Sequence, residues 1–269
     1  MLIDNINDLF FSQLALTVYD KCKLKFRRRY IDGLFWPADW SGNKEQKEMV
    51  EKGRKFHLLA QRYFARGENI QKEYLTDELV QWFSRLKEFR PYNDVDIFKA
   101  EYDLRINKNT LKLVSKYDLL YIDERSNRFI IYDWKTNKKK LNANKLKDKL
   151  QTRVYLFVLK ESIVNVFSKK NISYDDISII YWNPRYPRQN NKITYTENMY
   201  KSDREFIKSK IKEIKSLSYD EFNAVSDEKT CKYCEYRPIC HGKEAKEIDI
   251  EEDDIDLELD WDSVDEISF

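Results

Sequence analysis

The chain has 269 residues, of which 42% are hydrophobic and 14% aromatic, so it can bury a sizeable core in one large domain or two small ones. No apolar run approaches the ~20 residues that a helix needs to cross a bilayer. The first residues, MLIDNINDLF, lack the basic start and apolar centre of a secretory signal. Both observations argue against a membrane or secreted protein, and we expect a cytoplasmic one with no membrane partner.

Charge is divided unevenly along the chain, although the net charge is only +2. Residues 244–269 hold 13 acidic residues and one basic residue, which leaves 48 bases and 34 acids, a net charge of +14, on residues 1–243. A body this basic suits a polyanion such as nucleic acid, and a lysine-rich surface kept for solubility explains the charge equally well. The acidic tail is predicted to be disordered, and we hypothesise that it competes with DNA for the basic surface or docks a partner protein.

Helices are predicted for the first part of the chain and strands for the next. Apolar periodicity predicts three helices, over residues 12–31, 44–66 and 76–89. Three strands follow, over residues 96–106, 111–122 and 128–135. Their short connections predict an antiparallel meander. We then expect a helix, two strands and a helix, over residues 142–167, 176–183, 192–196 and 198–217. This order predicts an α/β fold with a mixed central sheet flanked by helices, and a helical cap built from the N-terminus and the cysteine-bearing C-terminus.

An acid and a base lie two positions apart at the end of the third predicted strand. In RFIIYDWK, alternation places Asp133 and Lys135 on one face, and Tyr132 and Trp134 on the other. Asp118 comes 15 residues earlier, on the preceding strand, and a hairpin would bring the two carboxylates together. Two carboxylates beside a lysine suit Mg²⁺, and the lysine can neutralise charge on a phosphate in the transition state. The alternative is an ordinary Asp–Lys surface pair with an unrelated Asp118.

Three further polar residues lie on predicted helices. Gln151 and Tyr155 are four residues apart, hence on one face of a mostly apolar helix, and can reach a bound backbone or a metal-held water. His57 is one of two histidines in the chain. It lies on an apolar helix face, where a core residue is commoner than a metal ligand.

Together these residues resemble the PD-(D/E)XK nuclease superfamily, and in particular its RecB-like branch, which includes the RecB and AddB nuclease domains and the CRISPR-associated exonuclease. The family motifs are G-x-x-x-H on a helix, G-x-x-D and D-x-K on successive strands, and Q-x-x-x-Y on the following helix. The chain reads GRKFH, SKYD, DWK and QTRVY in the same order, between Gly53 and Tyr155. The resemblance implies a restriction-endonuclease-like fold.

The resemblance also implies roles for these residues. The implied ligands of a catalytic Mg²⁺ or Mn²⁺ are His57, Asp118, Asp133 and the carbonyl of Trp134. The implied catalytic residues are Asp118, Asp133, Lys135, Gln151 and Tyr155. Lys135 would orient the attacking water or stabilise the phosphate. Glu101, on an earlier strand, is a weaker candidate that we do not rank with them. Ser115 stands where the motif has a glycine, which restricts close backbone approach but leaves the acid in place.

The four cysteines indicate a metal site. Cys231, Cys234 and Cys240 lie together in CKYCEYRPIC, and a reducing cytosol disfavours disulfides. The iron–sulfur subset of the resembled family has these three cysteines and a fourth near its first helix, where this chain has Cys22. The resemblance therefore implies a [4Fe–4S] cluster that staples the helical cap, and a structural Zn²⁺ is the alternative that four thiolates leave open. Lys23 stands where the family has a proline.

We therefore expect a metal-dependent deoxyribonuclease, an end-processing exonuclease of 5′ or 3′ polarity that hydrolyses single-stranded DNA with a metal-activated water. Within the resemblance, the histidine motif favours end processing. The implied pathways are DNA repair or recombination, CRISPR adaptation and antiviral defence, with a helicase or CRISPR adaptation proteins as partners. The alternative is a catalytically inactive DNA-binding or scaffold protein of the same fold.

A single nuclease domain is expected over residues 1–243. It would comprise a helical part (1–95), a catalytic core (96–200) and a C-terminal helix with the cysteines (201–243).

Overall fold

The structure is a computed structural model that describes residues 6–34, 44–68, 75–108, 110–169, 171–243 and 245. In this part of the chain five strands form one sheet in the order β1-β2-β3-β4-β5. They are β1 (Ile97–Lys108), β2 (Leu111–Asp123), β3 (Arg128–Trp134), β4 (Ile177–Trp182) and β5 (Asn191–Thr194). Apart from Ala245, the acidic tail lies outside the described residues, so its predicted disorder remains a prediction.

The sheet is mixed, as the order of elements predicts. β1, β2 and β3 form the predicted antiparallel meander, β4 pairs parallel with β3, and β5 pairs antiparallel with β4. A parallel pair needs a crossover, which α5 (Ala143–Lys147) and α6 (Leu150–Phe167) supply. The single helix predicted over 142–167 is therefore wrong in one respect: it is interrupted before α6, where Lys149 has an extended backbone with ψ of 142°.

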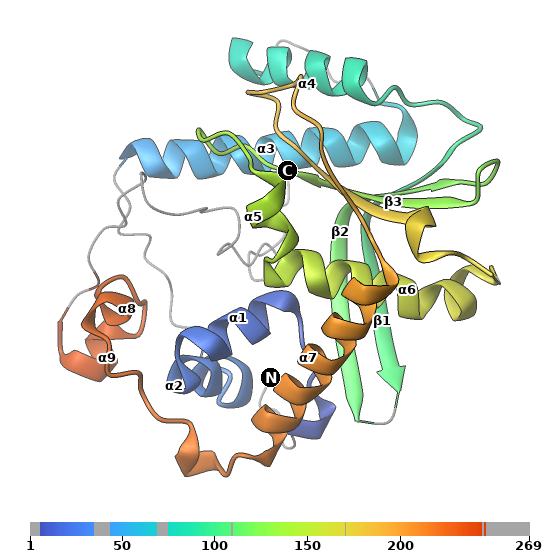
Figure 1. Ribbon diagram of the computed structural model, residues 1–269. Coiled ribbons are helices and arrows are strands. Elements are labelled where there is room, and N and C mark those ends of the chain that lie inside the picture. Colours follow the sequence, from blue (N-terminus) through green and yellow to red (C-terminus); the bar gives the residue numbers. More distant parts are fainter. Residues whose placement is uncertain are drawn as a thin grey trace.

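Helices cover both faces of the sheet (Figure 1). On one face, α3 (Lys44–Arg66) and α4 (Asp77–Phe89) pack on an aromatic core that includes Tyr132 and Trp134. On the other face, α6 packs on the sheet and α7 (Glu197–Ser216) packs on α6. The predicted helices over 44–66, 76–89 and 198–217 are confirmed as α3, α4 and α7 to within one residue at each end. No helix among the described residues is both long and apolar enough to span a bilayer.

The helix predicted over 12–31 is broken at Cys22. α1 (Gln13–Lys21) ends there, and α2 (Lys23–Phe26) and a π-helical turn, η2 (Arg27–Ile31), follow. Cys22 has an extended backbone, with φ of −161°, and its sulfur accepts a hydrogen bond from the Lys25 N–H at 3.4 Å. Cys22 therefore ends one helix and caps the next. Short 3-10 turns complete the described elements: η1 (Ile6–Asp8), η4 (Tyr174–Asp176) and η5 (Tyr219–Glu221).

The two ends of the described chain lie side by side (Figure 1). The cysteine-bearing segment contains two short helices, α8 (Glu228–Lys232) and α9 (Arg237–His241). This segment contacts the N-terminal helices directly, since Lys25 Nζ lies 2.7 Å from a Glu235 carboxylate oxygen. In addition, the Tyr236 hydroxyl donates to the Leu34 carbonyl at 2.6 Å. The two parts of the predicted helical cap are therefore in contact, and the metal cluster predicted to staple them stays a prediction.

Candidate active site

Asp133 and Lys135 lie at the carboxyl end of β3, on the face that α6 covers. Their side chains are only 4% and 7% exposed, so they are not a solvated surface pair. Lys135 Nζ is 2.8 Å from Asp133 Oδ1, and Gln151 on α6 donates from Nε2 to Asp133 Oδ2 at 2.9 Å. Buried charges need such partners, because desolvation of an unpaired charge costs several kcal/mol. Asp133, Lys135 and Gln151 are therefore in direct contact inside the protein.

Glu101 on β1 and Asp118 on β2 mark a point where the regular alternation of side chains between the two faces of the sheet is interrupted in both strands. On β2, Tyr117 packs toward α6 whereas Leu119 packs toward α3 and α4. A regular strand would put residues two apart on the same face. The change falls at Asp118, and the β1–β2 register skips Asp118 and Glu101, between the pairs Ala100–Leu119 and Tyr102–Tyr117. Glu101 has a left-handed φ of 47°, which residues other than glycine rarely adopt.

Asp118 connects the strands to helix α3. Its Oδ2 accepts a hydrogen bond from the Trp134 backbone N–H at 2.7 Å, and its Oδ1 lies 3.3 Å from His57 Nδ1. One ligand atom each from His57, Glu101 and Asp118 lies within 4.8 Å of the other two. An imidazole nitrogen and two carboxylates at this spacing can hold a divalent cation.

Gly53 allows α3 to approach the strand ends. A Cβ added at Gly53 would lie 2.9 Å from Thr136 Oγ1, just beyond β3. Gly53 and His57 are four residues apart, so they lie on the same side of the helix. Close approach at Gly53 therefore brings His57 against β2.

Burial dominates the electrostatics of these acids. Burial, reinforced by the Asp118 carboxylate, raises the pKa of Glu101 to about 7. Burial also raises the pKa of Asp133 to about 6, although Lys135 opposes the change. For Asp118, the effect of burial is outweighed by His57, Lys135 and the Trp134 N–H, so its pKa falls below the usual value. Burial thus favours the protonated forms of Glu101 and Asp133, whereas the neighbours of Asp118 favour its ionised form.

Tyr155 and Trp134 occupy different surroundings from one another. Burial, reinforced by the charges of Asp133 and Asp118, raises the pKa of Tyr155 well above its usual value, so its hydroxyl stays protonated. Trp134 reaches the site through its backbone, whereas its indole ring stacks on Phe64 in the opposite core, with ring centres 5.9 Å apart. Close contacts therefore join His57, Asp118 and the Trp134 backbone, and also Asp133, Lys135 and Gln151, whereas the group that could hold an ion contains Glu101 and not the predicted Asp133.

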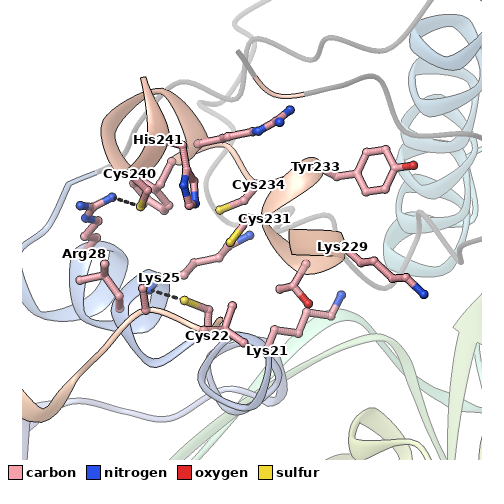
Figure 2. A pocket seen from close by; sticks show the side chains of 16 residues that line it. Lys21, Cys22, Lys25, Arg28, Lys229, Cys231, Tyr233, Cys234, Cys240 and His241 are labelled. Atoms are coloured by element: carbon pink, nitrogen blue, oxygen red, sulfur yellow. Dashed lines mark hydrogen bonds between the residues drawn. The ribbon is translucent and has the colours of Figure 1, made fainter. Parts of the chain in front are cut away.

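A cavity of about 400 Å³ lies between the N-terminal helices and the cysteine-bearing segment. Figure 2 shows that its lining includes all four cysteines, Cys22, Cys231, Cys234 and Cys240. Burial raises the pKa of Cys231, and the neighbouring Cys22 and Cys240 raise it further. Burial likewise raises the pKa of Cys234 to about 11. Four cysteines from distant parts of the sequence therefore share one space.

Comparison with known proteins identifies the family. The family model of the PD-(D/E)XK nuclease superfamily matches residues 11–94 and 68–241. The chain belongs to this superfamily.

Other comparisons are distant. No curated protein matches the chain. The crystal structure of an exonuclease candidate from Eubacterium rectale is similar at 9% identity and a TM-score of 0.45, over 77% of this chain and 81% of the other. A structure of a protein named SSO0001 is similar at 16% identity and a TM-score of 0.31, over 76% of this chain and 98% of the other.

PD-(D/E)XK nucleases use divalent metal ions, and the residues of this chain suit one. The group of His57, Glu101 and Asp118 offers one nitrogen and carboxylate oxygens. Asp133 Oδ1 is also buried, and the ammonium of Lys135 lies 2.8 Å from it, so a positive charge is accommodated beside this oxygen. The nuclease fold thus carries ligands that fit the metal its family requires.

Proposed function

We propose that this PD-(D/E)XK protein is a metal-dependent deoxyribonuclease of the RecB-like branch, with a single nuclease domain over residues 1–243, and that it trims single-stranded DNA from its ends. One observation carries the proposal: the Asp133–Lys135 pair at the end of β3 lies next to the group of His57, Glu101 and Asp118, since Asp118 accepts a hydrogen bond from the Trp134 N–H. The G-x-x-x-H motif on α3 supports end processing. DNA repair, recombination or CRISPR adaptation is the proposed setting, with a helicase or adaptation proteins as partners.

The side chains around the metal ligands would each act on the phosphodiester. A divalent cation held here would activate water and withdraw charge from the scissile phosphate. Lys135 would neutralise charge that develops on the phosphate oxygens, because its ammonium lies beside the acids. Gln151 would hold Asp133 Oδ2 and Lys135 would hold Oδ1, so that the carboxylate keeps one orientation at the proposed metal site. Tyr155 stays protonated and would donate a hydrogen bond to the substrate backbone.

A cleavage assay on four substrates tests this function. Purified full-length protein is incubated with Mg²⁺ or Mn²⁺ and labelled linear single-stranded DNA, linear duplex, circular single-stranded DNA or RNA. We expect stepwise shortening of the linear single strand, no cutting of the circle, and no reaction in EDTA. Cutting of the circle would show an endonuclease. If none of the four substrates is cleaved, the result would favour the alternative, a catalytically inactive DNA-binding or scaffold protein.

We also propose that the four cysteines hold an iron–sulfur cluster. Tetrahedral zinc with Zn–S bonds of ~2.3 Å requires sulfurs about 3.8 Å apart. Among the described residues, no three of the cysteine sulfurs lie within 4.8 Å of one another. A space of about 400 Å³ also suits a polynuclear cluster better than one ion. Arg28 donates to Cys240 Sγ at 2.9 Å and would favour a negatively charged cluster (Figure 2).

Metal analysis of anaerobically purified protein tests the cluster. We expect about four iron and four sulfide per chain, visible absorption, and the loss of both in a Cys22→Ser variant. Thr230→Ser, which changes a cavity residue without removing a sulfur, is the control. One zinc per chain with no sulfide would instead identify a structural zinc site.

A further inference from the structure

Two loops leave the same edge of the sheet beside the candidate active site. β3 and β4 are parallel, so their carboxyl ends lie at one edge. The loops that follow them, residues 135–142 and 183–190, begin there, and the first starts with Lys135. Ligands of α/β sheets commonly bind at this kind of edge. These two loops together are called the basic clasp below.

Hydrogen bonds fix the two loops of the basic clasp to each other. Asn183 is only 1% exposed, and its Nδ2 donates to the Asn137 carbonyl at 2.9 Å and to Asn137 Oδ1 at 3.1 Å. Arg185 Nε donates to a carbonyl of the same loop at 3.1 Å. The Tyr186 hydroxyl donates to the Lys138 carbonyl. The loop after β4 therefore holds the backbone of the lysine-rich loop in one position.

The basic clasp and the segments that follow it carry a dense positive charge. Residues 135–149 and 183–192 contain ten basic residues and one acidic residue. Seven of the ten basic residues are exposed, among them Lys139, Lys140 and Arg188. Basic side chains at this density repel one another, and a bound polyanion relieves the repulsion.

We propose that the basic clasp binds the phosphate backbone of the DNA strand that is being cut. Because Lys135 begins the first loop, phosphates next to the scissile one would meet Lys139, Lys140 and Arg188. Contacts of this type position a strand without reading its bases, so binding is independent of sequence. The inference rests on the proposed nuclease function and adds to it the path of the substrate strand.

A binding experiment with charge-matched variants tests the path. The full chain carrying Asp133→Asn, kept in EDTA so that no cleavage occurs, is titrated into a fluorescent 20-nucleotide DNA at several salt concentrations. The clasp variant adds Lys139→Gln, Lys140→Gln and Arg188→Gln. The control adds Arg204→Gln, Lys208→Gln and Lys212→Gln, which are exposed residues of α7 with the same loss of charge. Thermal unfolding checks that all variants are folded.

The clasp variant is expected to bind about tenfold or more weakly at 100 mM salt, with a salt slope that is flatter by about two, because each phosphate contact contributes ~0.7. The control should change affinity by less than about twofold. If the clasp variant binds DNA as tightly as its parent, or if both variants are weakened equally, the proposed binding of DNA by the basic clasp is wrong. If the wild type still cleaves DNA in that case, the nuclease function stands alone. A wild type that neither binds nor cleaves DNA contradicts both.

Discussion

At the scale of single residues, Glu101 is a candidate metal ligand whose protonation would weaken the binding of a cation. Burial and the neighbouring Asp118 raise its pKa to about 7, so Glu101 holds a proton below neutral pH in the metal-free protein. That proton must leave when a cation binds. We therefore predict that Mn²⁺ affinity falls as the pH decreases through 7.

A Glu101→Gln variant tests this dependence. Calorimetry on the DNA-free protein should show Mn²⁺ affinity at least about tenfold weaker at pH 8, a loss of ~1.4 kcal/mol. Its pH dependence should be shallower by one proton, because the group that titrates is gone. Glu205→Gln, on the exposed side of α7, is the matched control. If Glu101→Gln behaves like this control, Glu101 is not a ligand.

Residue patterns predicted some of this site and missed the rest for a definite reason. Alternation along β3 correctly placed Asp133 and Lys135 on one face, because β3 is regular. The same rule fails on β1 and β2, where the backbone switches faces at Glu101 and Asp118. The left-handed backbone conformation of Glu101 cannot be predicted from the sequence, because no glycine or turn motif marks it. Pairing the two strands across their short turn would have placed Glu101 opposite Asp118, and this register was the available signal.

At the scale of elements, the approach of α3 to the end of β3 depends on Gly53. A Gly53→Ala change gains ~1 kcal/mol of helix propensity but forces a Cβ to within 2.9 Å of Thr136 Oγ1. Overpacking of this kind costs about 1–3 kcal/mol, so we predict a net loss of stability and weaker Mn²⁺ binding through a displaced His57. Denaturant unfolding and calorimetry measure both.

A double variant separates this contact from a general effect on the helix. Adding Thr136→Ala removes the Oγ1, and the double variant should recover stability relative to the sum of the single changes. Lys55→Ala, at an exposed position of α3, is the control for helix propensity. Additive effects of Gly53→Ala and Thr136→Ala would show that the contact is unimportant.

Element boundaries were predictable where the apolar pattern and a cap agree. α4 begins after Thr76, whose side chain accepts from the Leu79 N–H at 3.4 Å, close to the predicted start. Two predicted helices were too long, and each breaks at a residue with extended backbone, Cys22 or Lys149. The apolar pattern continues across both breaks, so periodicity alone could not find them.

At the scale of the whole molecule, the order of elements was enough to predict a mixed sheet with helices on both faces. The meeting of the two chain ends was suggested by Cys22 and the three later cysteines. The contacts that join these ends, such as Lys25 with Glu235, have no sequence signal because they link surfaces 210 residues apart.

The acidic tail offers a prediction at this same scale. Residues 244–269 carry 13 acids against a body of net charge +14, so the tail should compete with DNA for basic surface. Deleting it should strengthen DNA binding at low salt, and the gain should shrink as salt screens the charges. Fluorescence anisotropy with and without the tail measures this effect. Equal affinity of the two proteins at low salt would rule out competition.

The most direct test of the account is DNA cleavage by an Asp133→Asn variant compared with the wild type at saturating Mn²⁺. The account predicts that wild-type protein shortens linear single-stranded DNA and that Asp133→Asn loses about 10³-fold or more of this rate, since a buried acid at the metal is removed. Asp103→Asn, the same change at an exposed position of β1, should cleave like the wild type. Equal cleavage by wild type and Asp133→Asn, or none by the wild type, would contradict the proposed nuclease site.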